Sequence, residues 1–318
     1  MAVWGFQRRR HDGGLRLDLH VHFATEQPGG ELSQRFRSSL VFRVLRRTEA
    51  RGEDPAAALR ARLITGATQA AVLEGIVVLA LDRPHSEVGL PLAPDLFVAN
   101  STVAALGRET GKIRLGASVH PYRRDALEAL DEAVALGAVL LKWLPNVQGI
   151  DPASPRCSPF YRRLRELSLP LLSHTGDEHT LPASTQSLGD LRRLVPALEA
   201  GVTVIAAHAG TGGGVPLTEI VSLVERYPRL FLECSALWTP HRFGAMQRLL
   251  GIDSIRDKWV YGSDWPVPIF WPWLWRRGSP ALREAKAISN PFDRRAAAAV
   301  ALGVPPGALS RGGELCRA

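Results

Sequence analysis

The chain has 318 residues, of which 46% are hydrophobic and 22% are charged, and its formal net charge is +8. This composition is typical of a folded globular protein with a sizeable core. No apolar run reaches the roughly 18 residues of a membrane helix, and no apolar signal-peptide segment follows the basic first ten residues, so a membrane protein is not expected.

The first predicted element is a strand that ends in Asp18-Leu19-His20-Val21-His22. Because alternate side chains of a strand face the same way, Asp18, His20 and His22 are expected on one face. Leu19 and Val21 are then expected on the other. Two imidazoles about 7 Å apart along a strand can hold one divalent ion if the strand end twists. Asp18 is a candidate for orienting one of the ligand rings.

The segment after this strand has a helical pattern. Apolar residues recur at helical spacing over residues 31–48, and Asp54 with Pro55 provides a cap and a first-turn proline for a helix to about Ala70. These helices are longer than one crossover needs. We therefore predict a helical insertion over about residues 23–70, within a single domain that covers residues 15–318. Residues 1–14 are predicted to be an N-terminal extension.

Eight short apolar segments are predicted to be buried strands, and a helical pattern follows each of them. The strands begin near residues 15, 75, 113, 138, 169, 202, 230 and 259. The later predicted helices cover residues 96–110, 125–136, 159–167, 188–200, 217–226, 241–250 and 293–302, the last of which closes the chain. Eight such units predict an α/β fold, the (β/α)8 TIM barrel. A doubly wound open sheet is the alternative, but the first turn lacks its glycine-rich motif.

Side chains that can bind a metal follow five of these strands. They are His20, His22, Lys142, His174, His208 and Asp264. The carboxyl ends of barrel strands meet at one mouth, where barrel enzymes place their chemistry. Imidazole and carboxylate ligands suit a divalent metal, most of all Zn2+, with one position left open for water. One ion or two are compatible with this set.

The motifs at these strand ends resemble those of the amidohydrolase superfamily of metal-dependent TIM-barrel hydrolases. They are Asp18-x-His20-x-His22, His174-Thr175-Gly176, His208-Ala209-Gly210 and Gly262-Ser263-Asp264-Trp265-Pro266. The second and the last motif resemble the amidohydrolase-2 branch, which also holds aminocarboxymuconate-semialdehyde decarboxylase and related decarboxylases. The resemblance spans nearly the whole chain.

This resemblance implies roles for the six residues. The positions that match the family's metal ligands are His20, His22, His174 and Asp264. His208 matches a histidine that either binds a second metal or acts as a catalytic group. Lys142 is similar to the lysine that carries a CO2-derived carbamate between two metals in the binuclear hydrolases. In mononuclear members, a lysine here only packs or binds substrate.

Three further residues are candidates for binding substrate. His120 ends the third strand, Arg242 could hold a substrate carboxylate, and Trp265 begins an aromatic segment that could contact a cyclic substrate. The structural alternatives are a satisfied wall residue for His120 and a packed hydrophobic loop for the segment after Asp264. Glu178 is a candidate for gating the mouth, and Glu233 is expected only to satisfy buried polarity.

Two reactions fit these residues. The first is hydrolysis of a C–O or C–N bond in a lactone, ester or amide by metal-activated water. In that reaction Asp264 shuttles the proton, and His208 stabilises the oxyanion or holds a second metal. The alternative is a metal-dependent non-oxidative decarboxylation with the same ligands, in which Asp264 or His208 protonates the carbon. A non-catalytic barrel would bind no metal, and the complete ligand set disfavours it.

Charge and cysteine content define the expected partners and compartment. The basic residues are scattered in short runs and accompany no nucleic-acid-binding motif, so the expected partner is a small molecule, for which an acidic or a cyclic substrate is one option. Cys157, Cys234 and Cys316 are widely spaced, which is typical of a reducing compartment. We predict a cytoplasmic protein, for which a homo-oligomer remains open.

Overall fold

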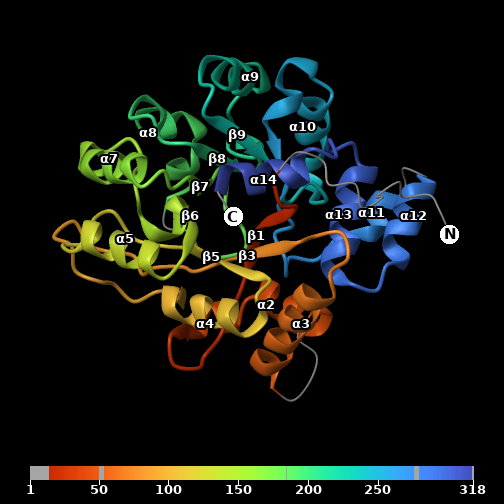
Figure 1. Cartoon of the computed structure of the whole chain (residues 1–318), viewed down its shortest axis with the longest axis horizontal. Coiled ribbons are helices and arrows are strands. Elements are labelled where there is room, and N and C mark those ends of the chain that lie inside the picture. The colour runs from red at the N-terminus through yellow and green to blue at the C-terminus, as the bar shows by residue number, and fades with distance from the viewer. Residues whose placement is uncertain (1–13, 50–53, 184, 276–278, 317–318) are drawn as a thin grey trace.

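The computed structural model describes residues 14–49, 54–183, 185–275 and 279–316. Eight parallel strands form one sheet in the order β1-β3-β5-β6-β7-β8-β9-β10 (Figure 1). Their bounds are β1 Leu17–His22, β3 Gly75–Leu79, β5 Ile113–Ala117, β6 Ala138–Trp143, β7 Leu171–His174, β8 Val204–Ala207, β9 Leu230–Glu233 and β10 Trp259–Val260. The chain after β10 returns to β1, where the amide of Leu19 donates to the Tyr261 carbonyl at 3.1 Å and Val21 pairs with Trp265. The predicted (β/α)8 barrel is confirmed.

Helices surround this sheet, as Figure 1 shows. Those before β8 are α1 Gln34–Arg37, α2 Leu40–Thr48, α3 Pro55–Gln69, α4 Asn100–Thr110, α5 Ala126–Ala135, α6 Pro145–Gln148, α7 Ser158–Glu166 and α8 Val195–Glu199. Those after it are α9 Leu217–Arg226, α10 Pro240–Leu250, α11 Trp271–Trp275, α12 Pro280–Ala287, α13 Pro291–Ala301 and α14 Ala308–Cys316. Among the described residues, no helix is both long enough and apolar enough to span a membrane.

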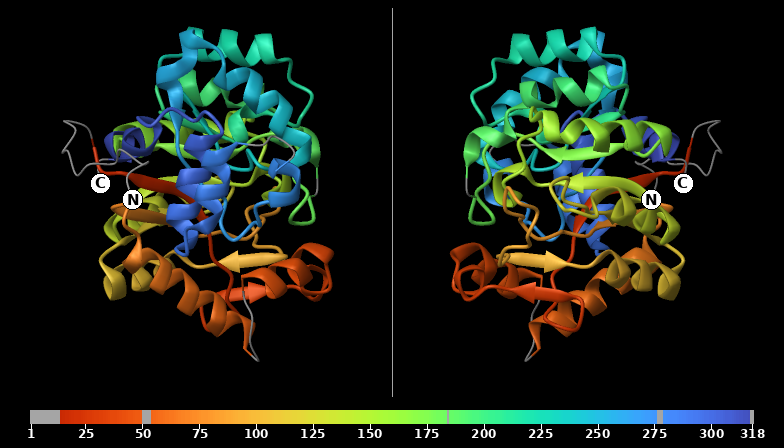
Figure 2. Two further views of the ribbon diagram at one scale, coloured as in Figure 1. Left: turned by 90° about the vertical axis from the view of Figure 1, so that its right-hand side faces the viewer. Right: turned by 90° about the vertical axis from the view of Figure 1, so that its left-hand side faces the viewer.

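The start of the predicted 31–48 helix is wrong. Gly30–Leu32 forms a strand, β2, which pairs antiparallel with β4, Leu96–Val98, and the rest splits into α1 and α2. Ser33 and Ser39 each accept a hydrogen bond from the amide three residues later, so two N-caps start two helices. Figure 2 shows this small sheet and α1 to α3 on one side of the barrel.

Three other boundaries differ from the predicted ones. The helix predicted over 96–110 begins only at Asn100, because β4 occupies its first residues. The 188–200 helix is mostly two 3-10 turns followed by α8. The 293–302 helix begins at Pro291 and does not close the chain, because α14 follows it. Of the predicted extension at 1–14, residues 1–13 lie outside the described residues.

The side chains inside the barrel form a small apolar cluster of their own. It comprises Leu17, Leu19, Val77, Leu79, Leu140, Leu172, Ile205, Ala207, Val260 and Cys316. Val21 packs instead in the larger cluster that includes the surrounding helices. The pairing of β1 with β3 shifts register between Asp18 and Val21, and such a bulge breaks strict alternation. The expectation that Leu19 and Val21 share a face is therefore wrong.

Candidate metal centre

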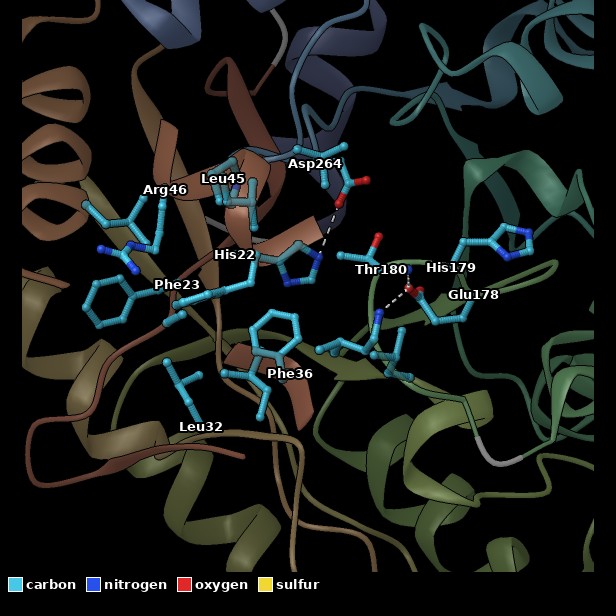
Figure 3. Close-up of a pocket in the computed structure, with 18 of the residues that line it drawn as sticks. His22, Phe23, Leu32, Phe36, Leu45, Arg46, Glu178, His179, Thr180 and Asp264 are labelled. Carbon is cyan, nitrogen blue, oxygen red and sulfur yellow. Dashed lines mark hydrogen bonds and ion pairs between the residues drawn. The ribbon is translucent and has the colours of Figure 1, made fainter. Parts of the chain in front are cut away.

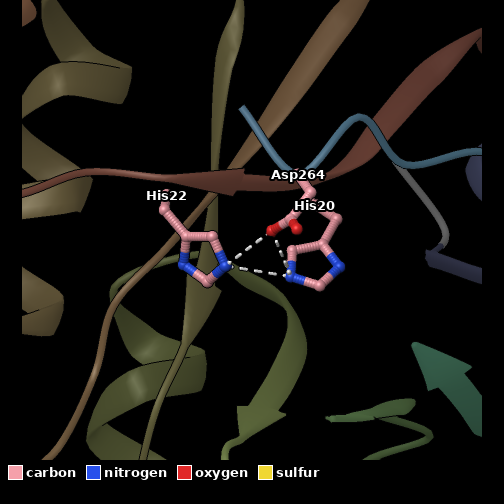
Figure 4. A group of neighbouring side chains, drawn as sticks. All are labelled: His20, His22 and Asp264. Atoms are coloured by element: carbon pink, nitrogen blue, oxygen red, sulfur yellow. Dashed lines mark hydrogen bonds and ion pairs between the residues drawn. The ribbon is translucent and has the colours of Figure 1, made fainter. Parts of the chain in front are cut away.

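Three side chains converge at the carboxyl end of β1. The Nε2 atoms of His20 and His22 are 3.0 Å apart. Asp264 Oδ1 lies 3.2 Å from the Nε2 of His22 and 3.6 Å from that of His20 (Figure 4). Imidazole nitrogens and a carboxylate oxygen this close together form a donor set that fits one divalent ion.

Asp264 follows β10 in a left-handed conformation, with φ of +55°. This region is unfavourable for a residue with a Cβ, and the Asp264 amide is anchored there by donating to the His20 carbonyl at 2.8 Å. Although burial acts to raise the pKa of Asp264, the hydrogen bond from His22 and the nearby His20, His22 and Lys142 hold it below its usual value. The carboxylate therefore remains ionised beside the two imidazoles.

A second pair of histidines continues this row of rings. His208 Nε2 lies 3.1 Å from His174 Nδ1, and the rings of His20 and His208 have centroids 5.3 Å apart. The buried Nε2 of His174 has no hydrogen-bond partner among the described residues, whereas its Nδ1 lies 3.4 Å from Glu178 Oε2. The four predicted histidines therefore lie together. The unpartnered Nε2 of His174 is a further atom that could bind a metal or form a hydrogen bond with a ligand.

Lys142 also lies at this centre. It is on β6, and its Nζ is 3.2 Å from His20 Nε2. Burial lowers the pKa of Lys142 to about 8, against the attraction of Glu233 and Asp264. An amine that loses its proton this readily can bind CO2 as a carbamate, whereas a protonated ammonium would repel a neighbouring metal ion.

Glu233, which is expected from the sequence only to satisfy buried polarity, forms a polar layer behind the histidines together with Ser235, which the sequence analysis does not identify. Glu233 ends β9, and its Oε2 lies 3.2 Å from His20 Nδ1. Asp18, the residue expected to orient a ring, instead accepts hydrogen bonds from the backbone amides of His20 and Ser263. The position of Glu233 at the end of a strand could have indicated this role, because the other candidate residues also lie at strand ends.

The metal centre opens into a cavity of about 340 Å3 (Figure 3). His22, His174, His208 and Asp264 line its inner end. Its apolar wall includes Phe23, Leu32, Phe36, Phe42, Leu45 and Leu59, from β2, the helices α1 to α3 and the adjoining loop. The segment after β1 thus provides much of the surface that would contact a substrate.

Arg242 lines the same cavity, but its guanidinium is largely occupied. Its Nη1 donates to the carbonyls of Thr175, at 3.2 Å, and of Thr211, and its Nη2 donates to the Asp177 carbonyl at 2.7 Å. These bonds tie together the loops after β7 and β8. Arg242 therefore stabilises the cavity wall, and little of its hydrogen-bonding capacity is left for a substrate carboxylate.

Trp265 lies outside the cavity lining. Its indole Nε1 donates to Glu49 Oε2 at 3.3 Å, and its ring packs on Phe292 with centroids 5.4 Å apart. The following residues, Pro266 and Val267, line the cavity instead. The placement matches the packing alternative for Trp265.

His120 also lies away from the cavity, in a buried position. Its Nε2 is 3.0 Å from the Gln148 carbonyl, and its Nδ1 accepts the Tyr122 amide at 3.1 Å. Both bonds are satisfied only by the neutral ring with its proton on Nε2, because a second proton on Nδ1 would face an N–H group. Burial lowers the pKa of His120 to about 4, so the site is that of a satisfied wall residue.

This pKa predicts a pH-dependent contribution to stability. Between pH 6.5 and 4 the unfolded chain binds a proton at residue 120 that the folded chain rejects, so stability falls as pH falls. We expect the free energy of unfolding of the native chain, relative to His120→Gln, to drop by about 2 kcal/mol between pH 7 and pH 5. Urea unfolding of both proteins at the two pH values checks this. Equal drops in both proteins would contradict it.

Comparison with known proteins identifies one family. The model of the amidohydrolase family (Amidohydro_2) matches residues 17–292. No curated protein matches the chain. Among solved structures, an uncharacterised TIM-barrel protein from Bordetella bronchiseptica superposes with a TM-score of 0.61 at 15% identity, covering 95% of this chain and 99% of its own.

Two further structures share the fold. A probable 2-pyrone-4,6-dicarboxylic acid hydrolase from Acinetobacter baumannii, with citric acid bound, has a TM-score of 0.55 at 13% identity, with 94% of each chain covered. A 5-carboxyvanillate decarboxylase from Novosphingobium aromaticivorans, with bound manganese, has a TM-score of 0.50 at 13% identity, covering 93% of this chain and 97% of its own. At these identities the likeness establishes the fold alone.

Proposed function

The chain belongs to the amidohydrolase family, and on that basis we propose that it is a metal-dependent hydrolase of a C–O or C–N bond in a lactone, ester or amide. The observation that carries this proposal is the convergence of His20, His22 and Asp264 within 3.6 Å at the inner end of an apolar cavity. One protein with the same fold is a probable 2-pyrone-4,6-dicarboxylic acid hydrolase, which is in keeping with this proposal.

The residues that would hold the metal are His20, His22, His174 and Asp264, with His208 and a carboxylated Lys142 available to a second ion. When bound, a divalent ion such as Zn2+ supplies Lewis acidity that lowers the pKa of water and polarises a carbonyl. The unpartnered Nε2 of His174 supports its inclusion.

Asp264 is the proposed proton carrier. Its carboxylate lies beside the two imidazoles and stays ionised, so it can accept a proton from the attacking water and return it to the leaving group. Ser235 contacts His208 Nδ1 at 2.9 Å, and the opposite nitrogen, Nε2, lies 3.1 Å from His174 Nδ1. That contact favours His208 as a second ligand or as a hydrogen-bonding group toward the substrate oxygen.

The function is tested by chelation and assay. Purified protein is stripped with a chelator and reloaded with Zn2+ or Mn2+, then assayed against small lactones, aryl esters and amides, and in parallel for CO2 release from carboxylated aromatics. We expect hydrolysis that disappears on stripping and returns on reloading. Metal-dependent CO2 release without hydrolysis would replace the proposal with the decarboxylase alternative, and undiminished hydrolysis by metal-free protein would refute it.

The cavity supports a substrate that combines an apolar or cyclic body with an acidic group. Apolar side chains form most of its wall, and Arg46 of α2 lies at the same cavity without an ion pair to another described residue, as Figure 3 illustrates. By contrast, Arg37 at the cavity is already paired with Glu26.

Replacing Arg46 is therefore expected to affect substrate binding selectively. Arg46→Gln should raise KM for an acidic substrate about tenfold, equivalent to about 1.4 kcal/mol, and leave kcat nearly unchanged. Arg43→Gln, on the same helix but away from the cavity lining, is the matched control and should leave KM unchanged. Equal KM values for the native chain and Arg46→Gln would contradict this role.

A further inference from the structure

We infer that Glu233, together with Ser235, is a positioning residue that fixes the tautomers of His20 and His208, so that the Nε2 atom of His20 presents a lone pair to the metal centre and that of His208 presents one toward His174. This inference deepens the proposed function and rests on its metal centre. It assigns Glu233 a role other than satisfying buried polarity.

Glu233 occupies the centre of a fully buried network. Its Oε1 accepts the Ser235 amide at 2.6 Å. Its Oε2 lies 2.6 Å from Ser235 Oγ, 3.2 Å from His20 Nδ1 and 3.3 Å from the His208 amide. One carboxylate therefore contacts the residues that present two of the metal-facing rings.

The direction of each hydrogen bond follows from the chemistry of the groups. In its ionised form the Glu233 carboxylate only accepts, so the Ser235 hydroxyl and the His20 Nδ1 both donate to it. With its proton used in this way, Ser235 Oγ acts as an acceptor for His208 Nδ1, 2.9 Å away. The Ser235 carbonyl, 3.3 Å from the same nitrogen, can likewise only accept. Both rings are thus protonated on Nδ1.

The opposite nitrogen of each ring faces another candidate ligand. His20 Nε2 lies beside His22 Nε2 and Asp264 at the metal centre, and His208 Nε2 lies beside His174 Nδ1. A ligand imidazole binds a metal through a nitrogen without a proton, and an acceptor on the other nitrogen fixes that choice. Glu233 thus prepares two rings on different strands with one side chain.

The segment that follows β10 leaves room for this carboxylate at Gly262. A Cβ at that position would lie 2.1 Å from Glu233 Oε1 and 2.6 Å from the His20 Cβ. A residue with a side chain there would therefore displace the carboxylate, the ring or both. The close packing of Glu233 against the His20 ring thus depends on a glycine in the motif that carries Asp264.

The most direct test reads the tautomers without any metal. In the metal-free native protein labelled with 15N-histidine, long-range 1H–15N NMR should report Nδ1-protonated rings for His20 and His208, assigned through His20→Gln and His208→Gln. In Glu233→Gln the side-chain amide can donate to His20 Nδ1, so that ring should shift to the Nε2-protonated tautomer. An unchanged His20 tautomer in Glu233→Gln, or an Nε2-protonated ring in the native protein, would overturn the inference.

Zinc affinity gives an independent readout. Competition with a chromogenic chelator should show Zn2+ binding weakened about 10- to 100-fold in Glu233→Gln. Ser235→Ala removes the hydroxyl but keeps the backbone carbonyl 3.3 Å from His208 Nδ1, so His208 should remain Nδ1-protonated in that variant. Asp293→Asn is the matched control, because this buried carboxylate accepts hydrogen bonds from the amides of Ala71 and Val72 and belongs neither to the donor set nor to the cavity lining. Its loss should lower stability but not zinc affinity.

The outcomes separate the two proposals. If the native chain binds no Zn2+ or Mn2+, the proposed function fails, whereas the NMR tautomers still decide the role of Glu233. If the native chain binds Zn2+ and Glu233→Gln binds it equally well with an unchanged tautomer, only the positioning role fails. Thermal unfolding of each variant, compared with Asp293→Asn, separates loss of affinity from loss of fold.

Discussion

Asp264→Asn is expected to lower kcat by about 10^2- to 10^4-fold, which is the usual contribution of a general acid or base. The substitution keeps the shape of the side chain but removes the basic oxygen that lies 3.2 Å from His22 Nε2. The asparagine also removes the negative charge that lies beside His20 Nε2 and His22 Nε2. Steady-state kinetics on the substrate identified by the hydrolysis assays measures the loss.

A buried carboxylate elsewhere provides the control for this change. Asp82 accepts the His120 amide at 2.9 Å and pairs with Arg123, and it does not line the cavity. Asp82→Asn should lower stability while the folded fraction retains its turnover. Turnover by Asp264→Asn at the native rate, with circular dichroism unchanged, would remove Asp264 from the mechanism.

His22→Gln is expected to weaken Zn2+ binding by about 10^2- to 10^3-fold. Structural zinc sites with four ligands bind with about 10–16 kcal/mol, so one ligand corresponds to about 2.5–4 kcal/mol. His22 is the most exposed member of the donor set, with 32% of its side chain accessible, so its loss should disturb the barrel little. Isothermal titration with Zn2+ measures the affinity.

The control for His22 is a histidine at the same cavity. His241 lines the cavity and packs edge-on against His179, with ring centroids 5.3 Å apart, but it is not part of the donor set. His241→Gln should bind Zn2+ as the native chain does. A similar loss of affinity in both variants would indicate that the metal binds at the cavity rim, away from β1.

The barrel itself was predictable because its strands are buried on both sides. Short runs such as Gly75–Leu79 and Val204–Ala207 consist almost entirely of apolar residues, and a helical pattern separates one from the next. The small β2–β4 sheet was not predictable in this way. Its strands have three residues each and β2 is only partly buried, so their pairing depends on tertiary contacts that local periodicity does not encode.

The grouping of the strand-end histidines, Lys142 and Asp264 also followed from the sequence. In a parallel barrel, position at a strand's carboxyl end is sufficient to bring such residues to one mouth. The roles of side chains outside that mouth were harder to predict from the sequence. His120 and Trp265 also follow strands, yet each is turned toward buried partners outside the cavity.

Glu233 illustrates the complementary limit. Its place at a strand end could be read from the sequence, but its contact with the His20 ring could not. That contact requires the bulge in β1, the turn that places Ser235 against the carboxylate, and the absence of a side chain at Gly262. Each of these depends on register between strands that are distant in the chain.

The most direct test of the metal centre is the location of the ion itself. Crystals of the purified protein, with anomalous diffraction recorded at the edge of the metal found by elemental analysis, would place it. We predict an ion bound by His20 Nε2, His22 Nε2 and Asp264, at the 2.0–2.2 Å typical of zinc sites or slightly longer for manganese. An ion bound elsewhere, or a metal-free centre in fully active protein, would contradict this prediction.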